Sequence, residues 1–277
     1  MQIARTIAEM TTLRKELRGD VGFVPTMGYL HEGHLALVRQ ARAENPSVIA
    51  SIYVNPSQFG PGDDLARYPR DLEHDLHLLR RENTDIVFVP SDADMYPPGF
   101  SSWIEVEGIT GRLEGASRPG HFRGVATIVA RLFNIVRPSR AYFGQKDAQQ
   151  VLVIRRMVND LNMDVQIIAA PTVREGDGLA MSSRNVRLSP EERLAASVLF
   201  CALTLARELR GEGETDADEI RRRMTQLIGK EPLAQIDYIS VADAETLEEL
   251  SAVDRPALAS LAVCIGQTRL IDNITLE

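Results

Sequence analysis

The chain has 277 residues, enough for one large or two modest domains with a substantial buried core. Hydrophobic residues make up 44% of it, charged residues 25%, and the formal net charge is −8. This acidic balance gives no electrostatic reason to expect nucleic acid or an anionic membrane as a partner, and no apolar run reaches the roughly 18 residues of a membrane span. We therefore expect a cytoplasmic protein without nucleic-acid or membrane partners.

The first part of the chain alternates predicted strands with predicted helices. We predict strands at 21–24, 47–54 and 86–89, and helices that begin near Gly33 and that span 71–82. Pro25 should end the first strand, because proline cannot supply an N–H to the ladder. This alternation predicts a doubly wound, Rossmann-like α/β domain with a parallel sheet, in which ligands bind beyond the carboxyl ends of the strands.

The second part of the chain continues this alternation, and after the loop at 171–185 the order changes to two helices followed by strands. We predict a small extra strand at 103–107, helices at 125–135 and 147–161, and strands at 141–143 and 165–169. After a loop at 171–185, we predict helices at 194–209 and 217–227, followed by a strand at 236–241 and one or two more within 257–274. The chain should therefore divide into a Rossmann-like domain, 1–176, and a smaller α+β lid domain, 177–277.

A turn with two glycines and two histidines lies between the first strand and the first helix. His31 and His34 are three residues apart, which would place both imidazoles on one side of the first helical turn. Backbone N–H groups there have no partner within the helix, so a polyphosphate would meet N–H donors, the positive helix end and two imidazoles. The turn predicts an anion site, although a lone histidine near a helix start is more often only a polar cap.

Two later motifs offer further groups for the same phosphates. Lys146, in F-G-Q-K-D-A-Q-Q, follows a strand end and could neutralise phosphate, or it could simply pair with Asp147 in solvent. The loop 176–185 carries two serines and an arginine at 182–184. These groups suit a lid over a polyphosphate leaving group, although S-S-R-N is also a common loop or helix cap.

Two glutamines are candidates for contact with a second substrate. Gln58 follows the second strand, and its amide offers both a donor and an acceptor to a substrate with hydroxyl and carboxylate groups. A glutamine in a surface loop is the alternative. Gln150 lies one helical turn after Lys146 and shares its face, whereas Gln149 cannot face the same cleft. We therefore choose Gln150 as the second candidate.

Other reactive side chains give weaker signals. Arg118 and His121 either close the same cleft or cap the helix that follows them, and the sequence does not separate these alternatives. Cys201 and Cys264 lie in apolar surroundings, so we expect buried free thiols rather than a disulfide or a metal site.

Four motifs occur in one order that resembles a known family. H-E-G-H is similar to the HIGH-type signature of adenylyl-transferring enzymes. Together, P-T-M-G-Y-L-H-E-G-H, V-N-P-S-Q-F-G, F-G-Q-K-D-A-Q-Q and D-G-L-A-M-S-S-R-N resemble the pantothenate synthetases, over nearly the whole chain. The resemblance implies a ligase that uses ATP and Mg²⁺ to join pantoate to beta-alanine through a pantoyl-adenylate. It also implies release of AMP and pyrophosphate, and a homodimer.

The resemblance also implies roles for individual residues. ATP would be held by Met27, Gly28, Tyr29, Leu30, His31, Glu32, Gly33, His34, Gly144, Gln145, Lys146, Asp147, Val173, Met181, Ser182, Ser183 and Arg184. Catalysis would rest on His31, His34, Lys146, Ser182, Ser183 and Arg184, with His34 as the proton donor to the departing phosphate. Gln58 and Gln150 would bind pantoate. Where the resemblance implies two tandem acids after Y-P-R, this chain has His74 and Asp75, which leaves Asp75 as the candidate metal ligand.

Two other functions stay open at this point. Another HIGH-type nucleotidyltransferase, or a small relative of the aminoacyl-tRNA synthetases, would share H-E-G-H. The acidic charge and the lack of a basic appended domain disfavour the tRNA version. A non-catalytic nucleotide sensor would keep the phosphate turn but lose the lysine, serine and arginine groups, and these are present.

Overall fold

The N-terminal lobe is a six-stranded parallel sheet between two layers of helices. In the computed structural model, which describes residues 1–277, the strand order is β1-β4-β3-β2-β5-β6. The strands are β1 (Gln2–Ala4), β2 (Val21–Thr26), β3 (Ser47–Ile52), β4 (Ile86–Phe88), β5 (Arg140–Gly144) and β6 (Gln166–Ala170). The order reverses between β2 and β5, so the predicted doubly wound sheet is confirmed and its switch point lies at β2.

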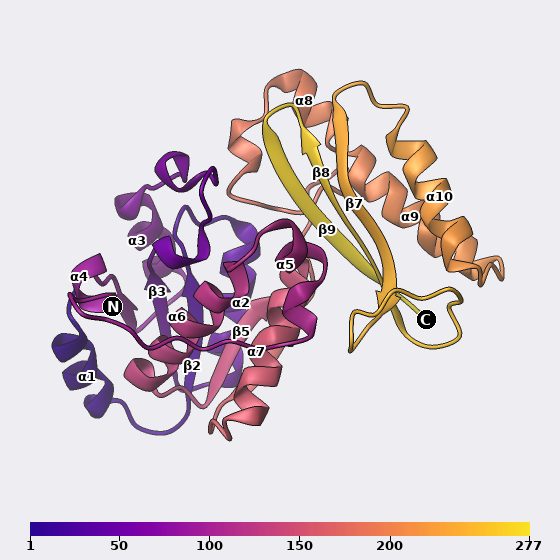
Figure 1. Cartoon of the computed structure of the whole chain (residues 1–277). Helices are drawn as coiled ribbons and strands as arrows, with labels where there is room; N and C mark the ends of the chain where they lie inside the picture. Colours follow the sequence, from indigo (N-terminus) through magenta and orange to yellow (C-terminus); the bar gives the residue numbers. More distant parts are fainter.

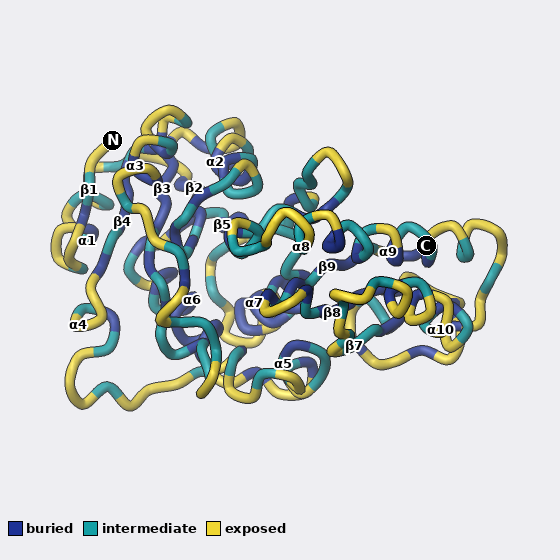
Figure 2. The backbone as a smooth tube through the Cα atoms, turned by 90° about the horizontal axis from the view of Figure 1, so that it is seen from above, coloured by how far each residue is buried: buried dark blue, intermediate teal, exposed yellow.

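Helices cover both faces of this sheet, as the alternation predicted. They are α1 (Ile7–Glu16), α2 (Glu32–Glu44), α3 (Leu72–Arg81), α4 (Asp92–Met95), α5 (Leu113–Ser117), α6 (His121–Val136) and α7 (Ala148–Asp160). Short 3₁₀ turns lie at η1 (Pro56–Gln58), η2 (Leu65–Arg67), η3 (Ile109–Gly111), η4 (Gln145–Asp147) and η5 (Asn185–Arg187). The central strands β2, β3, β4 and β5 are largely buried, while the outer sides of the helices are exposed (Figure 2).

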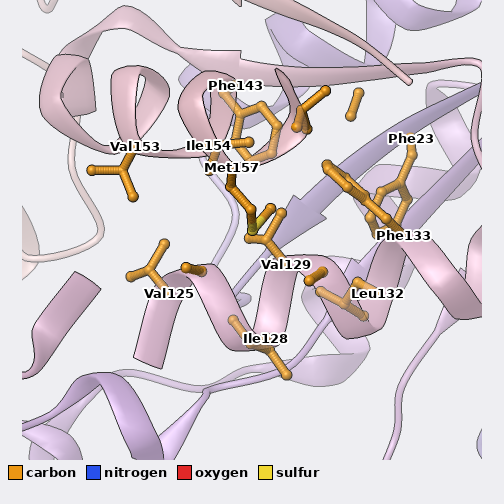
Figure 3. Close-up of a cluster of buried hydrophobic side chains, with 14 of the residues drawn as sticks. Phe23, Val125, Ile128, Val129, Leu132, Phe133, Phe143, Val153, Ile154 and Met157 are labelled. Atoms are coloured by element: carbon orange, nitrogen blue, oxygen red, sulfur yellow. The ribbon is translucent and has the colours of Figure 1, made fainter. Parts of the chain in front are cut away.

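Neighbouring residues of β2 pack on opposite faces of the sheet. Phe23 belongs to the core cluster that includes α1, α6 and α7, and its ring lies edge-on to Phe133, with centroids 6.4 Å apart. Figure 3 shows side chains of β2, β5, α6 and α7 gathered in this cluster. Val24, the next residue, packs with Leu37 of α2 and Leu79 of α3. Each such burial stabilises the fold by roughly 1.5–3 kcal/mol, which fixes the position of β2 and of the turn that follows it.

The C-terminal lobe is an antiparallel sheet backed by helices. Its strands, in the order β7-β8-β9, are β7 (Ala234–Asp243), β8 (Ala257–Ile265) and β9 (Thr268–Leu276). Its helices are α8 (Pro190–Ala195), α9 (Val198–Gly211) and α10 (Ala217–Ile228), which share a core with the sheet. In Figure 1, α9 and α10 lie on the side of the sheet away from the N-terminal lobe.

The two lobes have largely separate hydrophobic cores, which supports the prediction of a smaller α+β domain at the C-terminal end of the chain. Leu247 and Leu258 nevertheless pack into the core of the N-terminal lobe, so the lobes are in direct apolar contact. The exact boundary between 176 and 177 stays a prediction. No helix is both long enough and apolar enough to cross a membrane.

Several local predictions were wrong. No strand forms at 103–107; this segment instead crosses α6 as irregular chain, where the Ile104 N–H donates to Thr127 Oγ1 at 3.0 Å. β2 continues through Pro25 to Thr26 because β5 pairs only with the earlier residues of β2, so a missing N–H is tolerated there.

The cysteine prediction was wrong in part. Both thiols are free, as expected, but Cys201 is exposed and Cys264 is only half-buried. Cys201 lies in α9 beside the buried Ala202 and Leu203, so the apolar neighbours in the sequence face the core while the thiol faces outward.

Candidate active site

A cavity of about 510 Å³ opens beyond the carboxyl ends of β2, β3 and β5. Its walls come from the 25–34 segment, the 53–68 loop, the start of α7 and the 171–187 loop, with residues of β7, β8 and β9 on the other side. This is the place where doubly wound sheets bind ligands. Both lobes therefore contribute to one site.

Most of the predicted site residues line this cavity. The lining includes Met27, His31, Gly33, His34, Gln58, Gly144, Lys146, Asp147, Gln150, Val173, Met181, Ser182, Ser183 and Arg184. The predicted residues that do not line it are Gly28, Tyr29, Leu30, Glu32, Gln145 and Asp75. The fold thus brings together residues of all four motifs, which are far apart in the sequence, but it turns part of the first and third motifs away from the cavity.

The residues outside the cavity have other contacts. Glu32 is exposed and forms an ion pair with Arg39 on the next turns of α2. Leu30 is buried in the core between α2 and the sheet. The carbonyl of Gln145 accepts a hydrogen bond from Asn273 Nδ2 at 3.1 Å. The structure therefore gives no support to nucleotide contacts from these side chains.

The two histidines face each other at the start of α2. His31 is the N-cap, and its Nδ1 accepts from the Gly33 N–H at 3.1 Å. The His31 N–H in turn donates to His34 Nδ1 at 3.4 Å, and the ring centroids are 4.1 Å apart. Because Nδ1 accepts in both rings, the hydrogen-bond network assigns the proton of each neutral ring to Nε2, which can donate to a ligand.

Neither imidazole carries charge at neutral pH. Burial lowers the pKa of His31 to about 4, and the positive charge of Lys146 adds to this effect. Burial lowers the pKa of His34 to about 3, with further contributions from His31 and Lys146. The pair therefore offers hydrogen bonds rather than positive charge, and the positive charge at this end of the cavity comes from Lys146.

These lowered pKa values predict a fold that weakens in acid. Below pH 6.5 the unfolded chain binds protons at both histidines and the folded chain does not, so stability present above pH 6.5 is lost as the pH falls towards 4 and then 3. We expect the free energy of unfolding from chemical denaturation to fall between pH 7 and pH 5 by about 1–2 kcal/mol for each histidine. His31→Gln should reduce this slope, whereas His77→Gln, on an exposed face of α3, should preserve it. Titration of the His31 or His34 imidazole near pH 6.5 in the wild-type protein would contradict the prediction.

Lys146 is held in place from the C-terminal lobe. Asn273 Nδ2 donates to the Lys146 carbonyl at 2.9 Å, which fixes the backbone of η4 against β9. Lys146 Nζ lies 3.6 Å from Asp147 Oδ1, a long contact with a half-exposed carboxylate. Such a loose ion pair is weak. The ammonium group is therefore available to a negatively charged ligand.

Gln58 lies in a buried turn rather than in a free surface loop. Its Oε1 accepts from Asn55 Nδ2 at 3.0 Å, and its Nε2 lies 3.1 Å from Met27 Sδ. Asn55 Nδ2 also donates to the carbonyl of Gly124 in α6 at 3.2 Å. The turn is thus fastened to α6, and Gln58 presents its amide at the cavity wall.

The two neighbouring glutamines of α7 are used differently. Gln149 is buried, and its Nε2 donates to the carbonyls of Ile109 and Arg112 at 2.7 and 2.8 Å. Its Oε1 accepts from the Glu114 N–H at 3.0 Å, so the amide is committed to the fold. Both glutamines line the cavity, so the prediction that Gln149 cannot face the same cleft was wrong. Gln150 is half-buried, and its amide is not committed in this way. This arrangement agrees with the choice of Gln150 as the ligand-binding glutamine.

The serine and arginine loop is fastened to two other segments. Ser183 Oγ donates to the Tyr29 carbonyl at 3.1 Å. Arg184 forms a two-bond ion pair with Asp64, at 2.8 and 3.0 Å, and Arg187 reaches the same carboxylate at 2.6 Å. Burial alone would raise the pKa of Asp64, but the two guanidinium groups hold it well below its usual range. Arg184, which was predicted to bind phosphate, is therefore paired with the carboxylate of Asp64 in this structure.

Some cavity residues were left open or missed by the sequence analysis. His121 and Arg118 line the cavity and also fasten its loop: His121 Nδ1 lies 2.8 Å from the Gln58 carbonyl, and Arg118 pairs with Asp63 at 2.8 Å. The missed residues of the C-terminal lobe include Tyr238, Ser260, Gln267, Arg269 and Asn273. They lie on strands β7, β8 and β9, or, for Gln267, in the turn between β8 and β9. The alternation there predicts a sheet but carries no motif, so no signal marked them.

An ion pair between the buried Glu114 and the half-buried Arg269 joins the two lobes at the cavity wall. Glu114 of α5 accepts two bonds from Arg269 of β9, at 2.7 and 2.8 Å, and one from the Tyr238 hydroxyl at 3.0 Å. Asp237 pairs with the same arginine at 2.6 Å. Breaking such a pair from one side leaves a buried charge without a partner, which is strongly destabilising. The lobes are therefore held together beside the site.

Comparison with known proteins identifies the family. The family model described as pantoate-beta-alanine ligase matches residues 2–275. The chain belongs to this ligase family. It is 62% identical to the pantothenate synthetase of Roseiflexus sp. (strain RS-1) and 55% identical to that of Thermotoga petrophila, with all of each chain covered. The predicted pantoate–beta-alanine ligase is thereby confirmed as an enzyme that forms a C–N bond.

Solved structures of pantoate–beta-alanine ligases agree with the fold. The pantothenate synthetase of Thermus thermophilus has a TM-score of 0.95 and 52% identity, with 99% of each chain covered. The ligase of Francisella tularensis, complexed with beta-gamma ATP and beta-alanine, has a TM-score of 0.83 and 36% identity, with 99% of this chain and 97% of that chain covered. The doubly wound sheet with a smaller antiparallel sheet is therefore the fold of this family.

Proposed function

We propose that this ligase binds ATP and pantoate in the 510 Å³ cavity and joins pantoate to beta-alanine through a pantoyl-adenylate. One observation carries the proposal: the phosphate-type turn, Lys146, the 182–184 loop and both glutamines line the same cavity. The Francisella relative, which was solved with beta-gamma ATP and beta-alanine, supports ATP and beta-alanine as ligands. A non-catalytic nucleotide sensor would not need all these hydrogen-bond donors and charged groups in one cavity.

In the first step, a carboxylate oxygen of pantoate attacks the α-phosphorus of ATP. A new P–O bond forms, the bond between the α-phosphorus and the bridging oxygen breaks, and pyrophosphate leaves with that oxygen. The site contributes position and charge neutralisation rather than covalent chemistry. Lys146 supplies positive charge, and the Nε2–H groups of His31 and His34 donate hydrogen bonds to the departing phosphate.

Arg184 must exchange partners for this step. Its guanidinium is bound to Asp64 before any ligand arrives. A triphosphate offers more negative charge and can also accept two parallel N–H bonds from a guanidinium, so it competes for the same donors. We propose that phosphate binding releases the 182–184 loop from Asp64 and turns Arg184 towards the leaving group.

In the second step, the amine of beta-alanine attacks the acyl carbon of the adenylate. A C–N bond forms, the acyl C–O bond to AMP breaks, AMP leaves, and the amine loses a proton. Water would destroy the mixed anhydride, so the site must exclude it. The ion pair of Glu114 and Arg269 holds the lobes together at the cavity wall, which supports this shielding.

Magnesium and the homodimer stay predictions. The structure contains no group of three or more metal-binding side chains, so the residues present do not by themselves form a magnesium site. Magnesium commonly binds substrate phosphates and keeps several waters. We therefore propose that it enters with ATP, and we assign no step of the reaction to it.

Pyrophosphate release tests the proposed function. The protein is incubated with ATP, magnesium and pantoate, and pyrophosphate is measured before and after beta-alanine is added; lactate replaces pantoate in the control. We expect release that needs pantoate, and AMP with pantothenate once beta-alanine is present. ATP binding without turnover would favour the sensor, and release that accepts lactate equally would favour another nucleotidyltransferase.

A further inference from the structure

A buried carboxylate lies behind the 27–34 turn, outside the cavity. Asp75 of α3 is 1% exposed and does not line the cavity. Its Oδ2 accepts from the Tyr29 N–H at 2.8 Å, and its Oδ1 accepts from the Leu30 N–H at 2.7 Å. Charge-assisted bonds of this length are the strong ones. Both carboxylate oxygens therefore have backbone partners within the turn.

The conformation of the turn matches this carboxylate. Gly28 and Tyr29 both have positive φ, at +81° and +50°, a left-handed conformation that costs energy for tyrosine. A Cβ on Gly28 would lie 2.9 Å from Asp75 Oδ2 and 3.0 Å from Ile52 Cγ2. The turn thus lacks a side chain at the point where the carboxylate approaches, and the two N–H bonds hold Tyr29 in its strained conformation.

The same tyrosine connects the turn to the serine loop. The Tyr29 N–H is bound by Asp75, and the Tyr29 carbonyl is bound by Ser183 Oγ at 3.1 Å. Two residues later, His31 caps α2 and orients His34. A shift of Tyr29 would therefore move both the histidine pair and the attachment of the 182–184 loop.

We propose that Asp75 is a positioning residue of the ligase reaction, which shapes the 27–34 turn through its two backbone N–H groups and binds no metal. This inference rests on the proposed adenylation. It replaces the metal ligand expected at Asp75, because this carboxylate is 1% exposed, lies outside the cavity and already accepts two N–H bonds from the turn. Without the carboxylate, the two buried N–H groups lose their partners and the turn relaxes.

Asp75→Asn tests the proposal, with Glu73→Gln on the exposed side of α3 as the matched control. An amide can accept only one of the two N–H bonds, since its NH₂ group is a donor. We expect kcat for pantoate-dependent pyrophosphate release to fall about 10-fold, the KM for pantoate to stay within about twofold, and the magnesium concentration for half-maximal rate to stay unchanged. The imidazole NMR signals of His31 and His34 should shift in Asp75→Asn and not in Glu73→Gln.

Two results of this experiment would overturn the proposal. A higher magnesium requirement in Asp75→Asn would make Asp75 a metal ligand, and wild-type kcat with unshifted imidazole signals would leave it without a role in the turn. Wild-type activity itself is measured in the same assay, so a failure of the proposed function is seen separately.

A measurement on the unaltered protein decides the case if Asp75→Asn does not fold. Amide hydrogen exchange of Tyr29 and Leu30 is followed in the protein without ATP or magnesium. We expect both amides to be protected at least about 100-fold beyond an exposed loop amide such as that of Gly62. Exchange as fast as that of Gly62 would overturn the proposal.

Discussion

Replacing Lys146 with alanine is expected to lower the rate of adenylate formation about 100-fold or more, the loss typical for one charge-stabilising donor. The reason is local. His31 and His34 are neutral at pH 7, and Arg184 is paired with Asp64 before ligands bind. Lys146, whose only ion pair is the loose one with Asp147, is therefore the positive group available at this end of the cavity. Without it, the negative charge of the departing pyrophosphate is not compensated. Pantoate-dependent pyrophosphate release measures the effect.

Lys230→Ala is the matched control for this prediction, because Lys230 follows α10 at an exposed position far from the cavity lining. It should retain wild-type activity. Arginine at position 146 should restore only part of the rate, since a guanidinium is larger than an ammonium and presents a planar fork. Adenylate formation near the wild-type rate in Lys146→Ala would remove this residue from the mechanism.

The sequence predicted the sheet well because its signals are local. Short apolar runs bounded by prolines, alternating with amphipathic segments, predict a parallel sheet without knowledge of long-range contacts. The same locality explains the errors. β1 is only three residues long, and it pairs with β4 through residues such as Ile3 and Val87. The residues around Ile3 alone therefore give no sign that a strand forms there.

The site was predicted as motifs, and the structure separates each motif into residues with different tasks. His31 and His34 face the cavity, while Tyr29 and Leu30 of the same motif face Asp75. This division depends on a carboxylate 46 residues from Tyr29 in the sequence, which spacing alone cannot reveal. Asp64 was likewise visible only as one of two acids in a loop, and its pairing with Arg184 depends on tertiary structure.

Gly124→Ala is expected to damage both stability and pantoate binding. Gly124 lies in the first turns of α6, where the helix meets the turn that carries Gln58. A Cβ there would overlap the backbone carbonyl of Ser57 and lie 2.7 Å from the Cα of Gln58. Backbone cannot move aside as a flexible side chain can, so either the helix or the Gln58 turn must shift. Overpacking of this kind costs roughly 1–3 kcal/mol.

Two measurements check the Gly124→Ala prediction. The free energy of unfolding from chemical denaturation should fall by about 1–3 kcal/mol, and the KM for pantoate should rise about 10-fold because the Gln58 amide is displaced. Gly211→Ala is the matched control, since Gly211 ends α9 with open space around it and no positive φ. Alanine there should be neutral or slightly stabilising. Unchanged stability and KM in Gly124→Ala would mean that the contact between α6 and the Gln58 turn yields freely and does not position the glutamine.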